Sequence, residues 1–287
     1  MSQSTIQRFL FKEHAIRGQH VHLNDAWRDM ITDRHYGPTI QALLGELAVV
    51  ATMIANNLKH QGKITLQVQG SGPVHLLVIE VTHDLKIRGL AKTQESLNND
   101  ASFNEMLGDG QILVTLENTQ TRSHFQSFVP RESDTIAGCF EDFFTQSDQQ
   151  PARLWLAADA EHAGGFLLQK MPENGGHEVE VDEDAWNRTL LLAETLKEQE
   201  LLTLNCETTI HRLFHEELVE LFEEKTVCYE CPQDKERVDA MLRSLGEEEV
   251  RKILEEEGKI AIHNEICNFH LVYLKEDVDA LFATTMQ

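Results

Sequence analysis

The first 175 residues alternate between short stretches of period two and two apolar stretches of helical length. Ile64, Leu66 and Val68 alternate with polar residues, and Gly and Pro at 70–73 follow them, which predicts a hairpin of half-buried strands. Residues 39–58 are apolar around most of a helical circumference, so we expect a largely buried helix. Further expected strands cover 9–23, 111–129, 152–159 and 163–171, and a further helix covers 136–150. These patterns predict an α+β domain with antiparallel pairing over residues 1–175.

The pattern changes after this domain. The stretch 172–186, "PENGGHEVEVDEDAW", is rich in Pro, Gly, Asn and acidic residues and predicts a domain boundary. Two amphipathic helices are expected next, over 184–204 and 206–224, and they form a helical linker at 176–225. The apolar stripe of the second helix consists of Ile210, Leu213, Phe214, Leu218, Leu221 and Phe222.

A third segment, 226–287, has few large apolar residues. Helical patterns over 234–245 and 247–258 precede a strand-like stretch at 259–274. Domains this small often need a metal ion or a crosslink in addition to their core. We therefore expect a small C-terminal domain that depends on its cysteines.

Charge and hydropathy limit the possible partners. The formal net charge is −23, from 48 acidic and 25 basic residues, and such a surface repels the phosphates of duplex nucleic acid. The same charge keeps a protein soluble while it carries apolar surface. The pattern contains no apolar run of about 20 residues and no secretory signal, so we expect a cytoplasmic protein without a membrane partner.

Three of the five cysteines lie in the last sixty residues. Cys228 and Cys231 form a C-x-x-C clip, and Cys267 and His270 form a C-x-x-H clip, with His263 as an alternative fourth ligand. Zinc prefers four thiolate or imidazole ligands presented in two such clips. The spacing is therefore compatible with zinc, and equally with cysteines that are free or form a disulfide.

Histidine pairs offer a second chemistry. His20 and His22 would lie on one face of a strand, and His211 and His215 would lie one turn apart on a helix. Either pair suits a metal-dependent hydrolase, although fourteen histidines make chance pairs common. The chain contains no nucleotide-binding glycine loop and no Gly-x-Ser-x-Gly elbow in the required setting. Cys139 and Cys206 occur singly in apolar helical patterns and are expected to be packing residues.

Long stretches of the chain carry a resemblance that covers nearly all of it. They include "RFLFKEHAIRGQHVHL", "LLGELAVVATMIANNLKHQGKITLQVQGSGPVHLLVIEV", "HRLFHEELVELFE" and "EEEVRKILEEEGKI". The chain resembles the bacterial thirty-three-kilodalton chaperonins, a family of redox-regulated heat-shock chaperones. The resemblance implies an ATP-independent holdase that binds unfolding client proteins, acts as a homodimer and is not an enzyme. It also implies four C-terminal cysteines that hold zinc while reduced, and whose oxidation to two disulfides releases the metal and unfolds the linker.

The resemblance is incomplete at the cysteines. Aligned with the family pattern, Cys231 takes the first cysteine position and Cys267 the fourth, but Gln233 and Asn264 take the second and third. Cys228 is an additional cysteine. We therefore expect altered or weakened redox control. One form is a single Cys228–Cys231 disulfide, and another is heat or acid triggering through the linker without a metal.

The leading interpretation is thus a holdase whose linker stripe is covered in one state and offered to clients in another. The residues expected to contact clients are Leu213, Phe214, Leu218, Leu221 and Phe222. The alternatives are the metal-dependent hydrolase and a zinc-ribbon module with fixed partners.

Overall fold

The computed structural model describes residues 3–94, 101–172, 184–232 and 235–283. Its contacts divide the chain into two compact units, an N-terminal unit, Met1–Glu230, and a C-terminal unit, Cys231–Gln287. Both contain helices and strands, and among the strand pairs of the described residues all but the pair of β12 and β5 are antiparallel, which confirms the predicted α+β class. The functional division at residues 175 and 225 stays a prediction, and most of the boundary stretch 172–186 lies outside the described residues.

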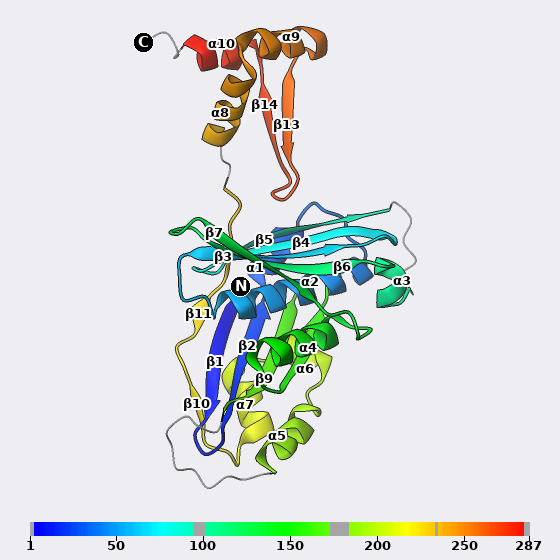
Figure 1. Ribbon diagram of the computed structural model, residues 1–287, viewed down its shortest axis with the longest axis vertical. Helices are drawn as coiled ribbons and strands as arrows, with labels where there is room; N and C mark the ends of the chain where they lie inside the picture. Colours follow the sequence, from blue (N-terminus) through cyan, green and yellow to red (C-terminus); the bar gives the residue numbers. More distant parts are fainter. Residues whose placement is uncertain (1–2, 95–100, 173–183, 233–234, 284–287) are drawn as a thin grey trace. The chain divides into compact units, whose positions relative to one another are not determined.

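The N-terminal unit is built on two sheets (Figure 1). The first sheet contains, in spatial order, β10 (Val219–Leu221), β1 (Thr5–Phe11), β2 (Ile16–Leu23), β9 (Ala163–Lys170) and β8 (Ala152–Ala158), with β11 (Lys225–Thr226) also paired to β1. The second sheet contains β12 (Cys228–Tyr229), β5 (Lys86–Thr93), β4 (Val74–Thr82), β3 (Gly62–Gln69), β6 (Gln111–Asn118) and β7 (Ser123–Val129). The predicted hairpins are confirmed as β3–β4 and β6–β7. The predicted strands 152–159 and 163–171 are confirmed as β8 and β9.

Helix α2 (Pro38–Ala55) lies between the two sheets and contacts strands of both (Figure 1). Pro38 begins the helix, where a missing N–H costs nothing. The apolar residues of α2 join inward residues of both sheets in one main core. Of the described helices, α2 alone is long and apolar enough to cross a membrane, but 67% of that window is buried inside the protein. Its composition therefore fits the predicted core helix.

Smaller helices complete this core. Helix α4 (Ile136–Asp148) is confirmed, and it ends before Pro151 with Gln149 in the left-handed region. Helices α1 (Asp25–Ile31) and α3 (Phe103–Leu107), like strand β5, were not predicted from the sequence pattern. Trp27 of α1 is fully buried, and its indole N–H donates to the Asp159 carbonyl at 2.8 Å.

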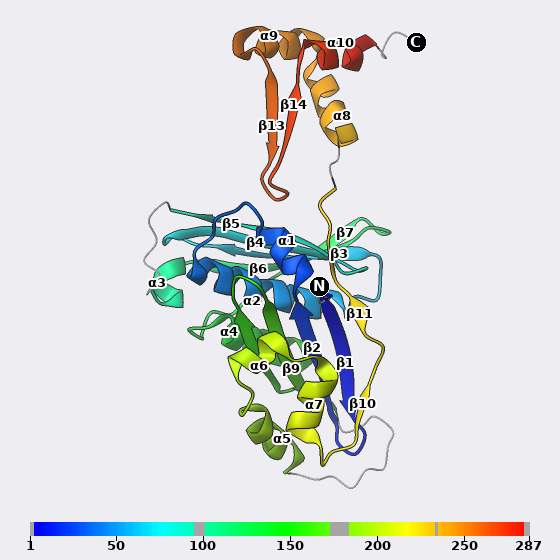
Figure 2. The same ribbon diagram turned by 180° about the vertical axis from the view of Figure 1, so that it is seen from behind.

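The predicted linker helices are shorter than the sequence pattern indicates. The stretch 184–204 forms two helices, α5 (Ala185–Ala193) and α6 (Glu198–Thr203), and the stretch 206–224 is helical only in α7 (Cys206–Phe214). The three helices, here called the helical layer, cover the face of the first sheet opposite α2 (Figure 2). The helical expectation for 215–224 is wrong, because Val219–Leu221 pairs as a strand with the edge of β1.

The C-terminal unit is small. It contains α8 (Lys235–Leu245), α9 (Glu247–Glu257), a hairpin of β13 (Ile260–Asn264) and β14 (Phe269–Tyr273), and α10 (Lys275–Ala283). Helices α8 and α9 and the strand-like stretch were predicted, whereas α10 was not. The buried apolar residues of this unit are Leu242, Val250, Ile260, Tyr273, Val278 and Leu281.

The close approach of α2 to the first sheet gives a prediction. A Cβ atom added at Gly45 would lie 2.4 Å from the Ala158 Cβ and 3.2 Å from the Ala163 Cβ. Replacing Gly45 with Leu therefore overpacks the contact between α2 and strands β8 and β9. We expect urea denaturation to show a loss of about 1–3 kcal/mol in the free energy of unfolding. The half-buried Ala42→Leu on the same helix is the control, and equal effects of the two variants would contradict the close packing.

Candidate functional site

The helical layer is attached to the first sheet by an apolar contact, here called the docking interface. Phe9 and Phe11 of β1 and Phe166 of β9 point toward the helices, and Phe214 of α7 packs against them. The ring centroids of Phe11 and Phe214 are 5.1 Å apart, and those of Phe9 and Phe166 are 5.2 Å apart. The helical layer contributes Ala193, Leu196, Leu201, Leu202, Cys206, Ile210, Leu213 and Phe214. This cluster is separate from the main core around α2.

Polar contacts fasten the edges of the docking interface. The Glu217 carboxylate lies 3.3 Å from the Arg188 guanidinium of α5 and 3.0 Å from the His14 imidazole in the β1–β2 turn. Arg212 of α7 pairs with Glu200 of α6 at 2.6 Å. The partly exposed pair of Arg212 and Glu200 contributes little free energy, and the attraction between the nearly buried His14 and Glu217 is offset by their desolvation. These polar contacts fix the position of the helices, while the buried phenylalanines supply most of the attachment.

The structure divides the predicted client-contacting residues into two groups. Leu213 and Phe214 are buried in the docking interface, as a covered stripe requires. Leu218, which is 60% exposed, Leu221 and Phe222, which is 40% exposed, lie beyond the end of α7. The six-residue helical stripe is therefore wrong as a single surface. Whether these five residues contact clients stays a prediction.

The sequence of β10 has the period-two alternation of a strand, but the helical spacing of the apolar residues before it is the stronger pattern. Val219 and Leu221 are half-buried and flank the exposed Glu220, which is an alternation of period two. Val219 pairs with Phe11 and Leu221 pairs with Phe9 on β1. This short edge strand was missed because three residues carry too little pattern to outweigh the helical spacing that precedes them.

The structure does not bring the two histidine pairs together into one site. His20 is 2% exposed, and its Nε2 atom has no hydrogen-bond partner among the described residues. The Nε2–H of His22 donates a hydrogen bond to the Leu202 carbonyl of α6. His211 and His215 are exposed at the C-terminal end of α7. The first pair lies under the helical layer and the second on its surface, so the hydrolase interpretation is not favoured.

The cysteines are arranged differently from the expectation. Cys231 and Cys267 form a disulfide with their Cα atoms 5.5 Å apart. Cys228 is free and exposed in β12, which pairs with β5. The expected Cys228–Cys231 disulfide is therefore wrong for this structure. Cys139 and Cys206 are buried, as predicted, and burial raises the pKa of both thiols, to about 12 for Cys206.

The residues expected to bind zinc do not form a metal site in this structure. The disulfide occupies both sulfurs, and the His263 and His270 rings stack on each other in a cross-strand pair with centroids 4.1 Å apart. Within the described ranges, no group of three or more His, Cys, Asp or Glu residues is arranged to hold a metal ion. The donor set shown here therefore does not fit zinc, and zinc binding stays a prediction.

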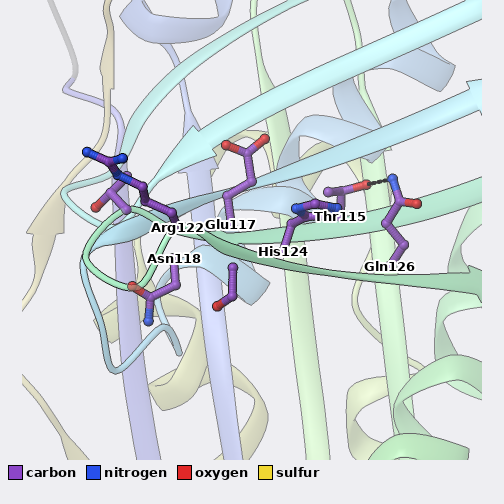
Figure 3. A pocket seen from close by; sticks show the side chains of 8 residues that line it. Thr115, Glu117, Asn118, Arg122, His124 and Gln126 are labelled. Carbon is purple, nitrogen blue, oxygen red and sulfur yellow. Dashed lines mark hydrogen bonds between the residues drawn. The ribbon is translucent and has the colours of Figure 1, made fainter.

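Two surface pockets contain polar side chains. One lies on the β6–β7 hairpin and includes Glu117, Arg122 and His124 (Figure 3). The only hydrogen bond drawn between its lining residues joins Gln126 to Thr115, at 3.2 Å (Figure 3). The other pocket lies beside the docking interface and contains His22, His162 and Glu224. Neither pocket presents a nucleophile with a hydrogen-bonded base, so we assign no catalytic centre to them.

Comparisons with known proteins agree over nearly the whole chain. A family model described as "Hsp33 protein" matches residues 4–273. A "33 kDa chaperonin" of Methylobacillus flagellatus is 39% identical over 280 residues, covering 97% of this chain and 94% of the relative. Another, from Shewanella sp. (strain MR-4), is 36% identical over 283 residues, covering 99% and 97%. The crystal structure of a 33 kDa chaperonin from Thermotoga maritima has a TM-score of 0.81 at 19% identity, covers 98% of both chains and shows the fold.

The buried imidazoles beneath the helical layer predict a dependence on pH. Burial, with a smaller contribution from His22, lowers the pKa of His20 to about 3, whereas an unfolded histidine titrates near pH 6.5. Burial also lowers the pKa of His22, although its bond to Leu202 opposes the shift and His162 adds to it. Between pH 6.5 and 3 the unfolded state binds more protons at His20, so stability falls as pH falls. From pH 6.5 to 4.5 we expect a loss of about 2–3 kcal/mol from His20.

The carboxyl group of Glu46 on α2 changes stability with pH in the opposite sense to His20. Burial first, and Glu198 second, raise the pKa of Glu46 to about 7, so this group removes stability as pH rises from about 4.5 to 7. We expect His20→Phe to flatten the acid loss and Glu46→Gln to steepen it. Urea unfolding at several pH values, followed by the fluorescence of Trp155 and Trp186 beside the docking interface, measures both slopes. Equal slopes for the native chain and His20→Phe would contradict this assignment.

Proposed function

Because the chain belongs to the Hsp33 family, we propose that it is a molecular chaperone that holds unfolding proteins and prevents their aggregation without hydrolysing ATP. In this role it is not an enzyme, and its partners are unfolded segments of many client proteins. We place it in the cytoplasm as part of the response to heat and oxidative stress. The proposed active form is a homodimer.

The docking interface is the observation that carries this proposal. The phenylalanines beneath the helical layer form a cluster of their own, and the main core around α2 does not include them. The helical layer can therefore leave the first sheet while the main core stays folded. Its departure would expose apolar surface on both the sheet and the helices, and such surface binds unfolded chains.

The charge of the chain fits this cycle. The net charge of −23 opposes self-association when apolar surface becomes accessible. Acidic side chains are frequent around the helical layer, and Glu198, Glu207 and Glu216 are examples. We propose that they keep the complex of chaperone and client soluble, while the apolar residues make the contact.

The proposed division of labour follows the three predicted segments. Residues 1–175 form the stable platform, 176–225 form the releasable linker, and 226–287 form the regulatory domain. Client contacts are assigned to Leu213 and Phe214 once they are uncovered, and to Leu218, Leu221 and Phe222 beside them. Zinc in the regulatory domain stays an expectation that the resemblance implies, and no step proposed here depends on it.

A direct assay tests the chaperone function. We expect the chain to suppress light scattering by a heat-denatured client enzyme at roughly equimolar ratios without added nucleotide. The reason is that suppression requires only accessible apolar surface. A matched amount of a folded acidic protein without chaperone activity serves as the control. Full aggregation of the client at all ratios and temperatures would contradict the proposal.

A pair of leucine variants tests the release of the helical layer. Leu201 of α6 is 2% exposed in the docking interface, whereas Leu191 of α5 is 67% exposed. We expect Leu201→Ala to weaken docking by about 2–5 kcal/mol, because it leaves a cavity. The variant should then suppress aggregation at a lower temperature than the native chain. Leu191→Ala is the matched control and should leave that temperature unchanged, whereas identical behaviour of the two variants would show that docking does not control activity.

A further inference from the structure

The disulfide between Cys231 and Cys267 joins the two ends of most of the C-terminal unit. Cys231 is the first residue of that unit, and Cys267 lies in the turn between β13 and β14. The bond spans 36 residues of sequence and encloses α8, α9 and β13. Every element that comes before the hairpin turn therefore lies inside the covalent loop.

The unit needs such a link because its core is thin. Among its described residues, 231–232 and 235–283, six buried apolar side chains support three helices and one hairpin. Helix α9 carries a mostly charged surface, and Val250 is its one buried residue. A unit of this size with so few buried groups is marginal without a crosslink, a metal or a partner.

Amide side chains, and not a third and fourth thiol, organise the turn around Cys267. The Asn264 Oδ1 atom accepts a hydrogen bond from the Cys267 backbone N–H at 3.4 Å. Asn268 has a φ of 48°, which is in the left-handed region that Asn tolerates, and its Oδ1 atom lies 3.3 Å from the His263 Nε2 atom. Asn264 thus completes a turn at a position where the family resemblance expects a metal-binding thiol.

The pairing of the two cysteines determines how strongly the bond acts. A bond between Cys228 and Cys231 would close a loop of three residues and would remove roughly half as much entropy, or less, from the unfolded chain as a bond that closes 36 residues. The Cys231–Cys267 bond closes 36 residues, and loop-closure entropy for that length changes the unfolding equilibrium by on the order of 10²–10³-fold. The observed pair is therefore the one that suits a stabilising crosslink.

We propose that the Cys231–Cys267 disulfide takes the place of a metal as the crosslink of the C-terminal unit, so that oxidation stabilises this unit and reduction loosens it. The reductant is a dithiol. One of its thiolates attacks a sulfur of the disulfide and displaces the other as a thiolate, which takes up a proton. The second thiolate of the reductant then closes a ring disulfide and releases the second cysteine. Two electrons pass to the chain, and the response to oxidants is opposite in sign to that of a zinc site built on four thiolates.

Hydrogen exchange of the full chain, followed by mass spectrometry, tests this proposal directly. The oxidised chain should carry three free thiols and a crosslink between Cys231 and Cys267, and dithiothreitol should yield five thiols. On reduction, amides in α9 and in the β13–β14 hairpin should exchange on the order of 10²-fold faster, while α2 and β3 should not change. Unchanged or slower exchange in the C-terminal unit after reduction would overturn the proposal.

Two variants and one metal addition complete the experiment. Cys231→Ser with Cys267→Ser should exchange like the reduced chain with or without dithiothreitol, whereas Cys228→Ser should respond like the native chain. Zinc chloride added to the reduced native chain should leave exchange fast. Restored protection with one bound zinc per chain, counted by elemental mass spectrometry, would overturn the metal-free crosslink.

The proposal rests on the proposed function only where it concerns regulation. Exchange reports on the C-terminal unit alone, without any client. A chain that shows the reduction-dependent exchange but protects no client would refute the chaperone function and support the crosslink. A chain that protects clients but keeps its C-terminal unit intact on reduction would refute the crosslink and support the chaperone function.

Discussion

The contact between the helical layer and the phenylalanines of the first sheet is the interaction on which the functional argument depends. It is large enough to order α5, α6 and α7, yet it is separate from the main core around α2. A single continuous core would unfold as a unit, so no intermediate could expose apolar surface and keep a platform. Two clusters on opposite faces of one sheet allow such an intermediate. One face of the first sheet thus packs in the main core, and its other face becomes exposed when the helical layer leaves.

Polar groups near this contact weaken the attachment of the helical layer to the first sheet. His20 is buried next to Phe166, and its Nε2 atom has no hydrogen-bond partner within the part of the chain that the structure describes. An apolar residue of similar size at this position would need no such partner. An unsatisfied buried polar atom costs stability and makes the interface weaker than its area indicates. After α7 the chain forms β10 and β11, and both pair with the edge of β1. The residues that follow the helical layer in sequence are therefore also attached to the first sheet. Release of the layer and loss of this pairing are consequently linked through the chain.

Periodicity predicted the parts of the fold in which one face is buried over many residues. Strands β3 and β4 and helix α2 follow this rule, because burial there is regular enough to leave a clear pattern. The end of α7 was wrongly predicted, since residues after Phe214 keep a helical spacing of apolar positions while the backbone pairs with β1. The partner of Cys231 could not be derived from spacing either. The nearer Cys228 is held in β12, and the turn of a distant hairpin brings Cys267 to Cys231. The pairing of β10 with β1 and the disulfide both depend on tertiary contacts, which cannot be predicted from the local sequence.

The two units obtain their stability by different means, and this difference determines which stimulus each one can sense. The N-terminal unit has a full core, so it responds to changes at a weakly attached layer, through heat or through protons on His20. The C-terminal unit has a thin core and a loop closed by a disulfide, so its stability responds to reduction or oxidation of that disulfide. The chain between the helical layer and Cys231 runs through β10, β11 and β12. Each of these strands pairs with its neighbour over no more than three residues, so little pairing holds this segment to the sheets of the N-terminal unit.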